Sequence, residues 1–243
     1  MISQASHSHD RFATTRWSMV MQFADTDTPL ALDALGELIQ RYRYPVYAYV
    51  RRCGHAPLVA EEITRTLLGR LMRDRGPAHQ PIASPHYRSF LLGRIRGFLG
   101  TDWKQACDED AAQADLAAPA DLEKRYQRDH ARPSSPEQAF HRSFALVVLQ
   151  RTLKRLRREA ADTGHADMCR ALEPFLTRDP RSSDYERVAA QLDVRRMTLV
   201  LALKRLRQRL HELASQELSD TVSSAEELAR EQDALLGILA ELA

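Results

Sequence analysis

The clearest periodic pattern in the chain lies over residues 182–210. Apolar residues at helical spacing predict a short helix over about 183–192 and a longer helix from about Arg196. Ser183 and Glu186 have the spacing of a capping box, which is typical of a helix start. Asp193 falls between the two helices, where a tight turn favours a residue that tolerates the left-handed conformation. A short helix, a tight turn and a longer helix indicate a helix-turn-helix.

The longer helix of this pair is strongly basic, through Arg195, Arg196, Lys204, Arg205, Arg207 and Arg209. A helix in the major groove of DNA could use such groups on phosphates and base edges. An ordinary helical hairpin with a solvated basic face fits the same pattern. Val200 is apolar at a position where a polar residue would serve DNA binding better.

Upstream of this region, apolar stripes predict helices over about 28–42, 46–52, 57–75 and 87–105. Pro45 is expected to separate the first two, because proline breaks helices. The fourth helix mixes aromatic residues with Arg88, Arg94, Arg96, Trp103 and Lys104. Aromatic rings stack on unpaired bases and guanidinium groups hold phosphates, so we expect these five residues to contact nucleic acid. Phe90 and Phe98 fit better as core residues.

Residues 106–134 change in composition and are rich in Asp, Ala and Pro, which indicates a linker. A new helix is expected at Ser135, because Pro136 and Gln138 complete a capping box with a first-turn proline. Leucines over 224–242 predict a tail helix. The sequence thus predicts an all-α chain with two small helical domains, 1–106 and 135–217. A flexible acidic linker, 107–134, would join them, and an amphipathic helix would follow within 218–243.

Composition narrows the classes of function. The chain has 243 residues, of which 28% are charged, and no apolar run approaches the roughly 20 residues needed to span a bilayer, so we expect a cytoplasmic protein without membrane insertion. Three scattered cysteines form neither a disulfide framework nor a zinc site. Residues 7–10 read as a polar tail in a disordered segment, 1–16, and not as a metal site. Without a nucleophile elbow, P-loop or zinc-protease motif, no enzymatic activity, cofactor or metal is expected.

With both halves considered, the chain resembles a bacterial RNA polymerase sigma factor of the extracytoplasmic-function type. The resemblance covers nearly the whole chain. It is carried by residues 44–52, 60–71 and 87–92, by Trp103 and by the helix-turn-helix. Residues 14–18 resemble the opening of a sub-branch that has a C-terminal extension.

The resemblance implies core RNA polymerase and promoter DNA as partners. The first domain would bind the polymerase through Glu61, Glu62, Arg65 and Thr66, and would read the −10 element. The second domain would read the −35 element through its basic helix, with the contacts at Arg195, Arg196, Thr198, Lys204 and Arg205.

The resemblance also suggests a mode of control. Arg65 and Thr66 stand where the family usually has acidic or amide residues, so the polymerase-binding surface is short of negative charge. A phosphate on Thr66 would supply about −1.5 to −2 charge. A Ser/Thr kinase acting at Thr66, or an anti-sigma factor, is therefore a candidate regulator. The alternative is a threonine that is simply tolerated on a solvated helix face.

Two other functions stay open. One is a degenerate sigma-like protein that regulates by binding other proteins through its apolar recognition helix, without binding promoters. The other is a conventional repressor-type regulator, although a single helix-turn-helix would leave the first domain unexplained.

Overall fold

The computed structural model describes residues 29–73, 87–101, 103–111, 121–130, 134–219, 221–222 and 224–240. These residues are almost entirely α-helical and include no β-strand, so the all-α prediction is confirmed. The predicted polar tail and the segment 14–18 lie outside the described residues, as do the loop 76–85 and the central part of the acidic segment, 112–120. None of the described helices is both long and apolar enough to cross a membrane.

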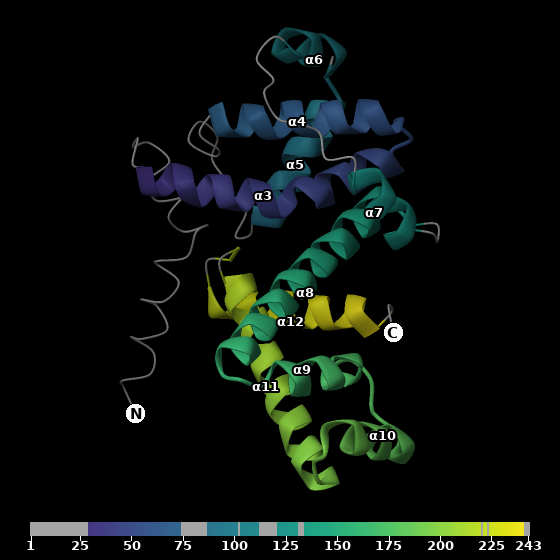
Figure 1. Ribbon diagram of the computed structural model, residues 1–243. Helices are drawn as coiled ribbons and strands as arrows, with labels where there is room; N and C mark the ends of the chain where they lie inside the picture. Colours follow the sequence, from purple (N-terminus) through teal and green to yellow (C-terminus); the bar gives the residue numbers. More distant parts are fainter. Residues whose placement is uncertain are drawn as a thin grey trace.

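Ten α-helices are described in Figure 1, with one 3-10 turn at Glu173–Phe175 between α9 and α10. Their bounds are α3 Pro29–Arg52, α4 Pro57–Arg73, α5 Tyr87–Leu99, α6 Trp103–Ala111, α7 Asp121–Asp129, α8 Pro136–Asp162, α9 Ala166–Leu172, α10 Ser182–Leu192, α11 Arg196–Ser219 and α12 Ala225–Ala240.

Pro45 lies inside α3, which runs without interruption from Pro29 to Arg52. The prediction of two separate helices is therefore wrong. The proline removes one backbone hydrogen bond, but its neighbours Tyr42, Val46 and Tyr47 are all buried in the core. The burial of these large side chains offsets the loss. The predicted fourth helix, by contrast, is divided into α5 and α6 at Gly100 and the following residues.

Helix α8 begins where the sequence predicts. The Gln138 N–H donates to Ser135 Oγ at 3.1 Å, and the Ser135 N–H donates to Gln138 Oε1 at 2.9 Å, completing the capping box. The first half of α8 packs on α3, where the Phe144 ring stacks on Tyr42 with centroids 4.9 Å apart. Its second half contributes Leu156 to another core. The two cores thus meet within α8, and not at a boundary before it. In Figure 1, α8 runs from beside α3 down to α9.

Helix α7 lies within the predicted linker and is docked on α3. Tyr47 Oη donates to Glu123 at 2.6 Å, and Arg51 Nε donates to the same carboxylate at 2.8 Å. Tyr44 Oη donates to Asp129 at 2.9 Å. The hydrogen bond from Arg51 lowers the pKa of Glu123 to about 2. The prediction of a flexible linker is therefore wrong for residues 121–130, because the acidic side chains have partners on α3.

Helix α12 packs against α8 and α11, with Leu235 buried. It also reaches α5, because Glu231 forms an ion pair with Arg88. The predicted tail helix is thus present and docked, and it covers part of the first core, to which Leu235 belongs.

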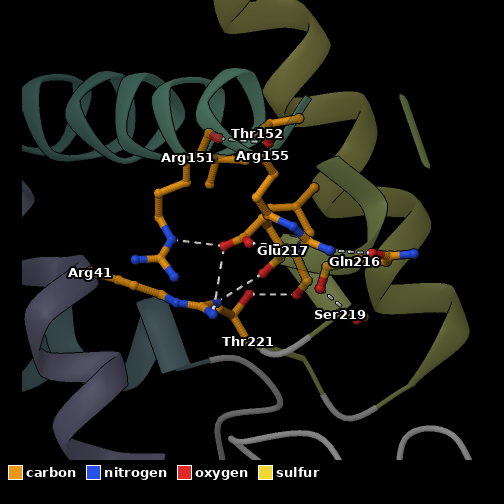
Figure 2. Close-up of polar contacts among 10 residues, drawn as sticks. Arg41, Arg151, Thr152, Arg155, Gln216, Glu217, Ser219 and Thr221 are labelled. Atoms are coloured by element: carbon orange, nitrogen blue, oxygen red, sulfur yellow. Dashed lines mark hydrogen bonds and ion pairs between the residues drawn. The ribbon is translucent and has the colours of Figure 1, made fainter. Parts of the chain in front are cut away.

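The side chain of Glu217, near the end of α11, joins three helices (Figure 2). Arg151 Nε and Arg155 Nη1, both from α8, donate to its carboxylate at 2.9 and 3.1 Å. Arg41 of α3 lies 3.6 Å from the carboxylate and also donates to the Glu217 backbone carbonyl, at 3.2 Å. Burial alone would raise the pKa of Glu217, but the arginines outweigh it and the pKa is lowered. We call these four residues the Glu217 cluster.

Candidate nucleic-acid interface

Helix α10 starts two residues earlier than the predicted capping box at Ser183 suggests. The Arg181 N–H donates to the Asp184 carboxylate at 3.0 Å, so Arg181 is the N-cap and Ser182 is the first helical residue. The predicted capping box of Ser183 and Glu186 does not form, because Ser183 is already inside the helix. A carboxylate in the first turn also suits the positive end of the helix dipole.

The turn between α10 and α11 forms as expected at Asp193, which has φ 51° and ψ 48°. The Val194 N–H donates to the Ala189 carbonyl at 3.1 Å, which closes the turn. Val194 itself packs against the second core. This fixes the direction in which α11 leaves the turn.

The inner face of α11 is held by Leu199 and Leu203, which are 0% and 3% exposed. The predicted DNA-contacting side chains are all exposed, two of them on the outer side of α11 and three at its start: Lys204 and Arg205, and Arg195, Arg196 and Thr198. In Figure 1, α10 and the start of α11 lie at the end of the molecule away from α4, α5 and α6. The helix-turn-helix therefore presents a basic face clear of the other described helices.

The cations of this basic face make few hydrogen bonds or ion pairs with other described residues. No hydrogen bond or ion pair holds the side chains of Arg195, Lys204 or Arg205 within the described part of the chain. Arg196 makes two weak contacts: its guanidinium donates a long hydrogen bond to Ser182 Oγ at 3.5 Å and lies 5.5 Å from the Tyr185 ring centre. Charges without internal partners are available to phosphates or base edges.

Two further arginines of α11 have internal roles. Arg207 donates to the Phe175 and Arg178 carbonyls at 2.8 and 2.7 Å. Arg209 makes a two-pronged contact with Glu159 of α8, at 2.7 and 2.9 Å. These side chains attach α11 to its surroundings and reduce the charge that the sequence suggested for DNA binding.

The exposed face of α11 also carries apolar side chains. Met197 is 65% exposed, Leu201 is 50% exposed and Val200 is 37% exposed. Of these three residues, Val200 is the one identified from the sequence as apolar at a position that would suit a polar residue. The signal for the other two was their spacing, because Met197 and Leu201 lie four residues apart and two positions out of step with Leu199 and Leu203.

Arg88 is not on a surface that could bind DNA. Its side chain is 11% exposed, pairs with Glu231 and lies 5.0 Å from the Phe144 ring centre. The prediction of a DNA contact at Arg88 is wrong, because α12 covers it. Periodicity within α5 could not show a helix that arrives from the far end of the chain.

The other predicted residues of α5 and α6 are only partly brought together. Trp103 is half-buried and meets the His55 ring edge-on at 5.2 Å, with Lys104 Nζ 5.8 Å from the Trp103 ring centre. Arg96 is exposed and pairs with Glu137 at 3.0 Å. Arg94 is half-buried on α5. The side of α5 near Arg94 and Arg96 is open, since a Cβ added at Gly93 or Gly97 would meet nothing within 4 Å.

The predicted polymerase-binding residues lie on α4, and three of them are partly exposed: Glu61, Glu62 and Arg65. Thr66 differs, because it is 4% exposed. Helix α6 packs on α4, and the Thr66 side chain hydrogen-bonds to the thiol of Cys107. Thr66 is thus not on a solvated face, and a kinase could not reach its hydroxyl in this arrangement. The predicted phosphorylation site is therefore wrong for the folded chain described here.

Among the described residues, no group of three or more His, Cys, Asp or Glu side chains could hold a metal ion. Comparisons of this chain with protein-family models, with curated proteins and with solved structures gave no match.

Proposed function

We propose that this protein is a cytoplasmic sigma factor of the extracytoplasmic-function type, which directs core RNA polymerase to specific promoters. The observation that carries the proposal is the helix-turn-helix, which presents four exposed cations at one end of the molecule, Arg195 in the turn and Arg196, Lys204 and Arg205 on the longer helix. The order of the sequence motifs described above supports the same family. An anti-sigma factor remains a candidate regulator, whereas phosphorylation at Thr66 does not.

In this proposal, the first turns of α11 enter the major groove of the −35 element. Arg196 and Thr198 stand at the start of the helix, where such helices touch base edges. Arg195, Lys204 and Arg205 are placed to neutralise phosphates on either side. Core polymerase would bind α4 near Glu61, Glu62 and Arg65, while Arg94, Arg96, Trp103 and Lys104 would serve the −10 element.

The first test is transcription by purified core polymerase on a pool of templates with random upstream sequence. The full chain should make initiation selective for a subset of templates. Initiation that is equally unselective with and without the chain would contradict the proposal.

The second test measures DNA binding by the full chain as salt is raised. The double variant Lys204→Ala/Arg205→Ala should reduce the slope of log affinity against log salt by about 1.8, since each neutralised phosphate contributes about 0.9. The matched control is Lys154→Ala/Arg158→Ala, which removes the same charge from exposed positions on α8. If both double variants change the slope equally, net charge and not the α11 face determines binding.

A second candidate function is a sigma-like regulator that binds proteins without binding promoters. It is favoured by the exposure of Met197 and Leu201 on the same face. It predicts that the full chain binds core polymerase or another protein, yet shows no salt-dependent affinity for any duplex in a random pool.

A further inference from the structure

The exposed apolar pair of α11 has no role in the contacts described so far. We propose that Met197 and Leu201 read thymine in the DNA site, by contact with its 5-methyl group in the major groove. This inference rests on the proposed function, because it requires α11 to enter duplex DNA. It gives a role in sequence recognition to two residues whose side chains cannot form hydrogen bonds with base edges.

The position of the pair supports the assignment. An α-helix turns about 100° per residue, so Met197 and Leu201 lie close to the direction opposite Leu199, which is fully buried. Both side chains therefore point away from the protein, toward the floor of the groove that α11 would enter. They also lie in the first turns of the helix, the part that contacts base edges in helix-turn-helix proteins.

The chemistry of the groove supplies a matching ligand. Thymine is the base that presents a methyl group in the major groove, and proteins read it by apolar contact. Cytosine and guanine present only hydrogen-bonding groups there. Exposed Met and Leu side chains cannot satisfy those groups, so a G·C pair beneath them would lose water without gaining a partner.

The surroundings of the pair favour DNA over a protein as its occupant. Arg195, Arg196, Lys204 and Arg205 surround the apolar centre and are exposed. The sequence has no acidic residue between Asp193 and Glu212. An apolar centre flanked by four exposed cations is complementary to base methyl groups between two phosphate backbones.

The test begins with selection of binding sites for the full chain from a pool of random DNA duplexes. Selected sites are then remade with uracil in place of thymine at one position at a time. Uracil keeps the O4 acceptor and the pairing with adenine, and loses only the methyl group. Affinity should fall about three- to five-fold at one or two positions, the value of one buried methyl group.

The variant Met197→Ala/Leu201→Ala links this loss to α11. Both side chains are exposed, so the variant should fold as the wild type does, which circular dichroism can check. It should bind the thymine and uracil duplexes equally. The control is Leu58→Ala, since Leu58 is 82% exposed on α4 and far from the helix-turn-helix in sequence. That variant should keep the wild-type preference for thymine.

Three results would overturn the inference. If duplexes are selected but no thymine position is sensitive to uracil, the pair does not read methyl groups, although DNA binding itself stands. If the double variant keeps the full preference for thymine, other residues read it. If no duplex is selected and binding does not depend on salt, the proposed function is contradicted, and this inference, which rests on it, is contradicted as well.

Discussion

Glu217 links α3, α8 and α11 through one buried carboxylate. Its carboxylate is 6% exposed and is shared by one nearly buried cation, Arg41, and two half-exposed cations, Arg151 and Arg155. A buried cation that loses its counter-ion is strongly destabilising, even where the intact pair adds little net stability. The Glu217 cluster therefore makes folding sensitive to one carboxylate.

Replacing Glu217 by Gln should lower the free energy of unfolding by about 2–4 kcal/mol. The estimate is below the largest values for buried pairs, because Arg151 and Arg155 can turn toward water. Unfolding in urea, followed by circular dichroism, would measure the change. The control is Glu186→Gln, an exposed position on α10, where we expect a change within about 0.5 kcal/mol. Equal effects of the two substitutions would show that the cluster contributes no more than a surface carboxylate.

His130 and His141 should make the protein less stable in mild acid. Burial, reinforced by Arg142 for His130 and by Arg88 for His141, lowers the pKa of each to about 4. The unfolded chain, with an ordinary pKa near 6.5, then binds more protons than the folded chain between pH 6.5 and 4. Stability is therefore expected to fall by about 1–2 kcal/mol per histidine as pH decreases from 7 to 5.

Urea unfolding at pH 7 and pH 5 would test this expectation. His130→Gln should flatten the pH dependence, because glutamine can keep a polar contact near Ser143, which lies 2.8 Å from His130 Nε2. Stability that is constant over this range would contradict the prediction. Below about pH 4.5 a second decline should follow, because the unfolded chain then protonates Glu123 and Glu217, whereas the lowered pKa values keep both charged to lower pH in the folded chain.

At the scale of elements, α6 covers part of α4 and so limits which of its residues a partner can contact. Ala106 and Cys107 of α6 are buried, and Thr66 lies beneath this helix. The side of α4 that carries Glu61, Glu62 and Arg65 is partly exposed and is open to a partner in this arrangement. Any partner that contacts Thr66 must first displace α6.

Thr66→Glu should therefore destabilise the chain by about 2–4 kcal/mol, or else release α6, because it places a charge in a buried position. Thr66→Val keeps the shape and should change stability little. Urea unfolding and limited proteolysis of residues 103–111 would measure the two effects. A Thr66→Glu variant as stable and as protease-resistant as the wild type would show that α6 does not cover this position in solution.

The positions of the helices were largely predictable from the sequence, but the contacts between helices were not. Local sequence signals correctly predicted three features: α4 from its periodicity, the start of α8 from its capping box, and the left-handed turn from Asp193. Each of these depends on residues close together in the chain. Such signals could not reveal that Arg88 meets Glu231, since that contact joins residues more than a hundred positions apart. The same limit explains Pro45, whose cost within the helix is offset by packing against α8.

The candidate interface shows the same division. The outward direction of Lys204 follows from its place outside the stripe of Leu199 and Leu203, which the pattern supplies. Arg196 shares the side of Leu199 and is exposed because it is the first residue of the helix. The internal use of Arg207 and Arg209 depends on which loop and helix pack beside them. Sequence periodicity defines the faces of a helix, but only the tertiary arrangement decides which charges are already paired.

At the scale of the whole molecule, the two cores share their helices. Helix α8 contributes Phe140 to the first core and Leu156 to the second, and α11 contributes Leu218 and Leu213 in the same way. Neither core can lose these helices without exposing apolar surface in the other. We therefore expect both halves to unfold together.

Leu38→Ala in the first core and Leu203→Ala in the second should lower the midpoint of one common thermal transition. Each side chain is almost fully buried, so each substitution should cost about 2–5 kcal/mol. Tryptophan fluorescence, which includes Trp103, and circular dichroism should give coincident curves. Two separate transitions, with each substitution moving only one of them, would mean that the halves fold independently.

Helix α5 should depart from this cooperative behaviour in its last turn. Gly93 and Gly97 each weaken the helix by up to about 1 kcal/mol relative to alanine, and neither has a neighbour within 4 Å of an added Cβ. Tyr87, Leu91 and Ile95 are fully buried and anchor the earlier turns. Backbone amides after Ile95, near Arg96 and Gly97, should consequently exchange with solvent deuterium by local opening, well before those of α8, which require global unfolding. The chain thus contains a short segment beside an exposed arginine whose conformation a bound ligand can determine at little cost to the rest of the fold.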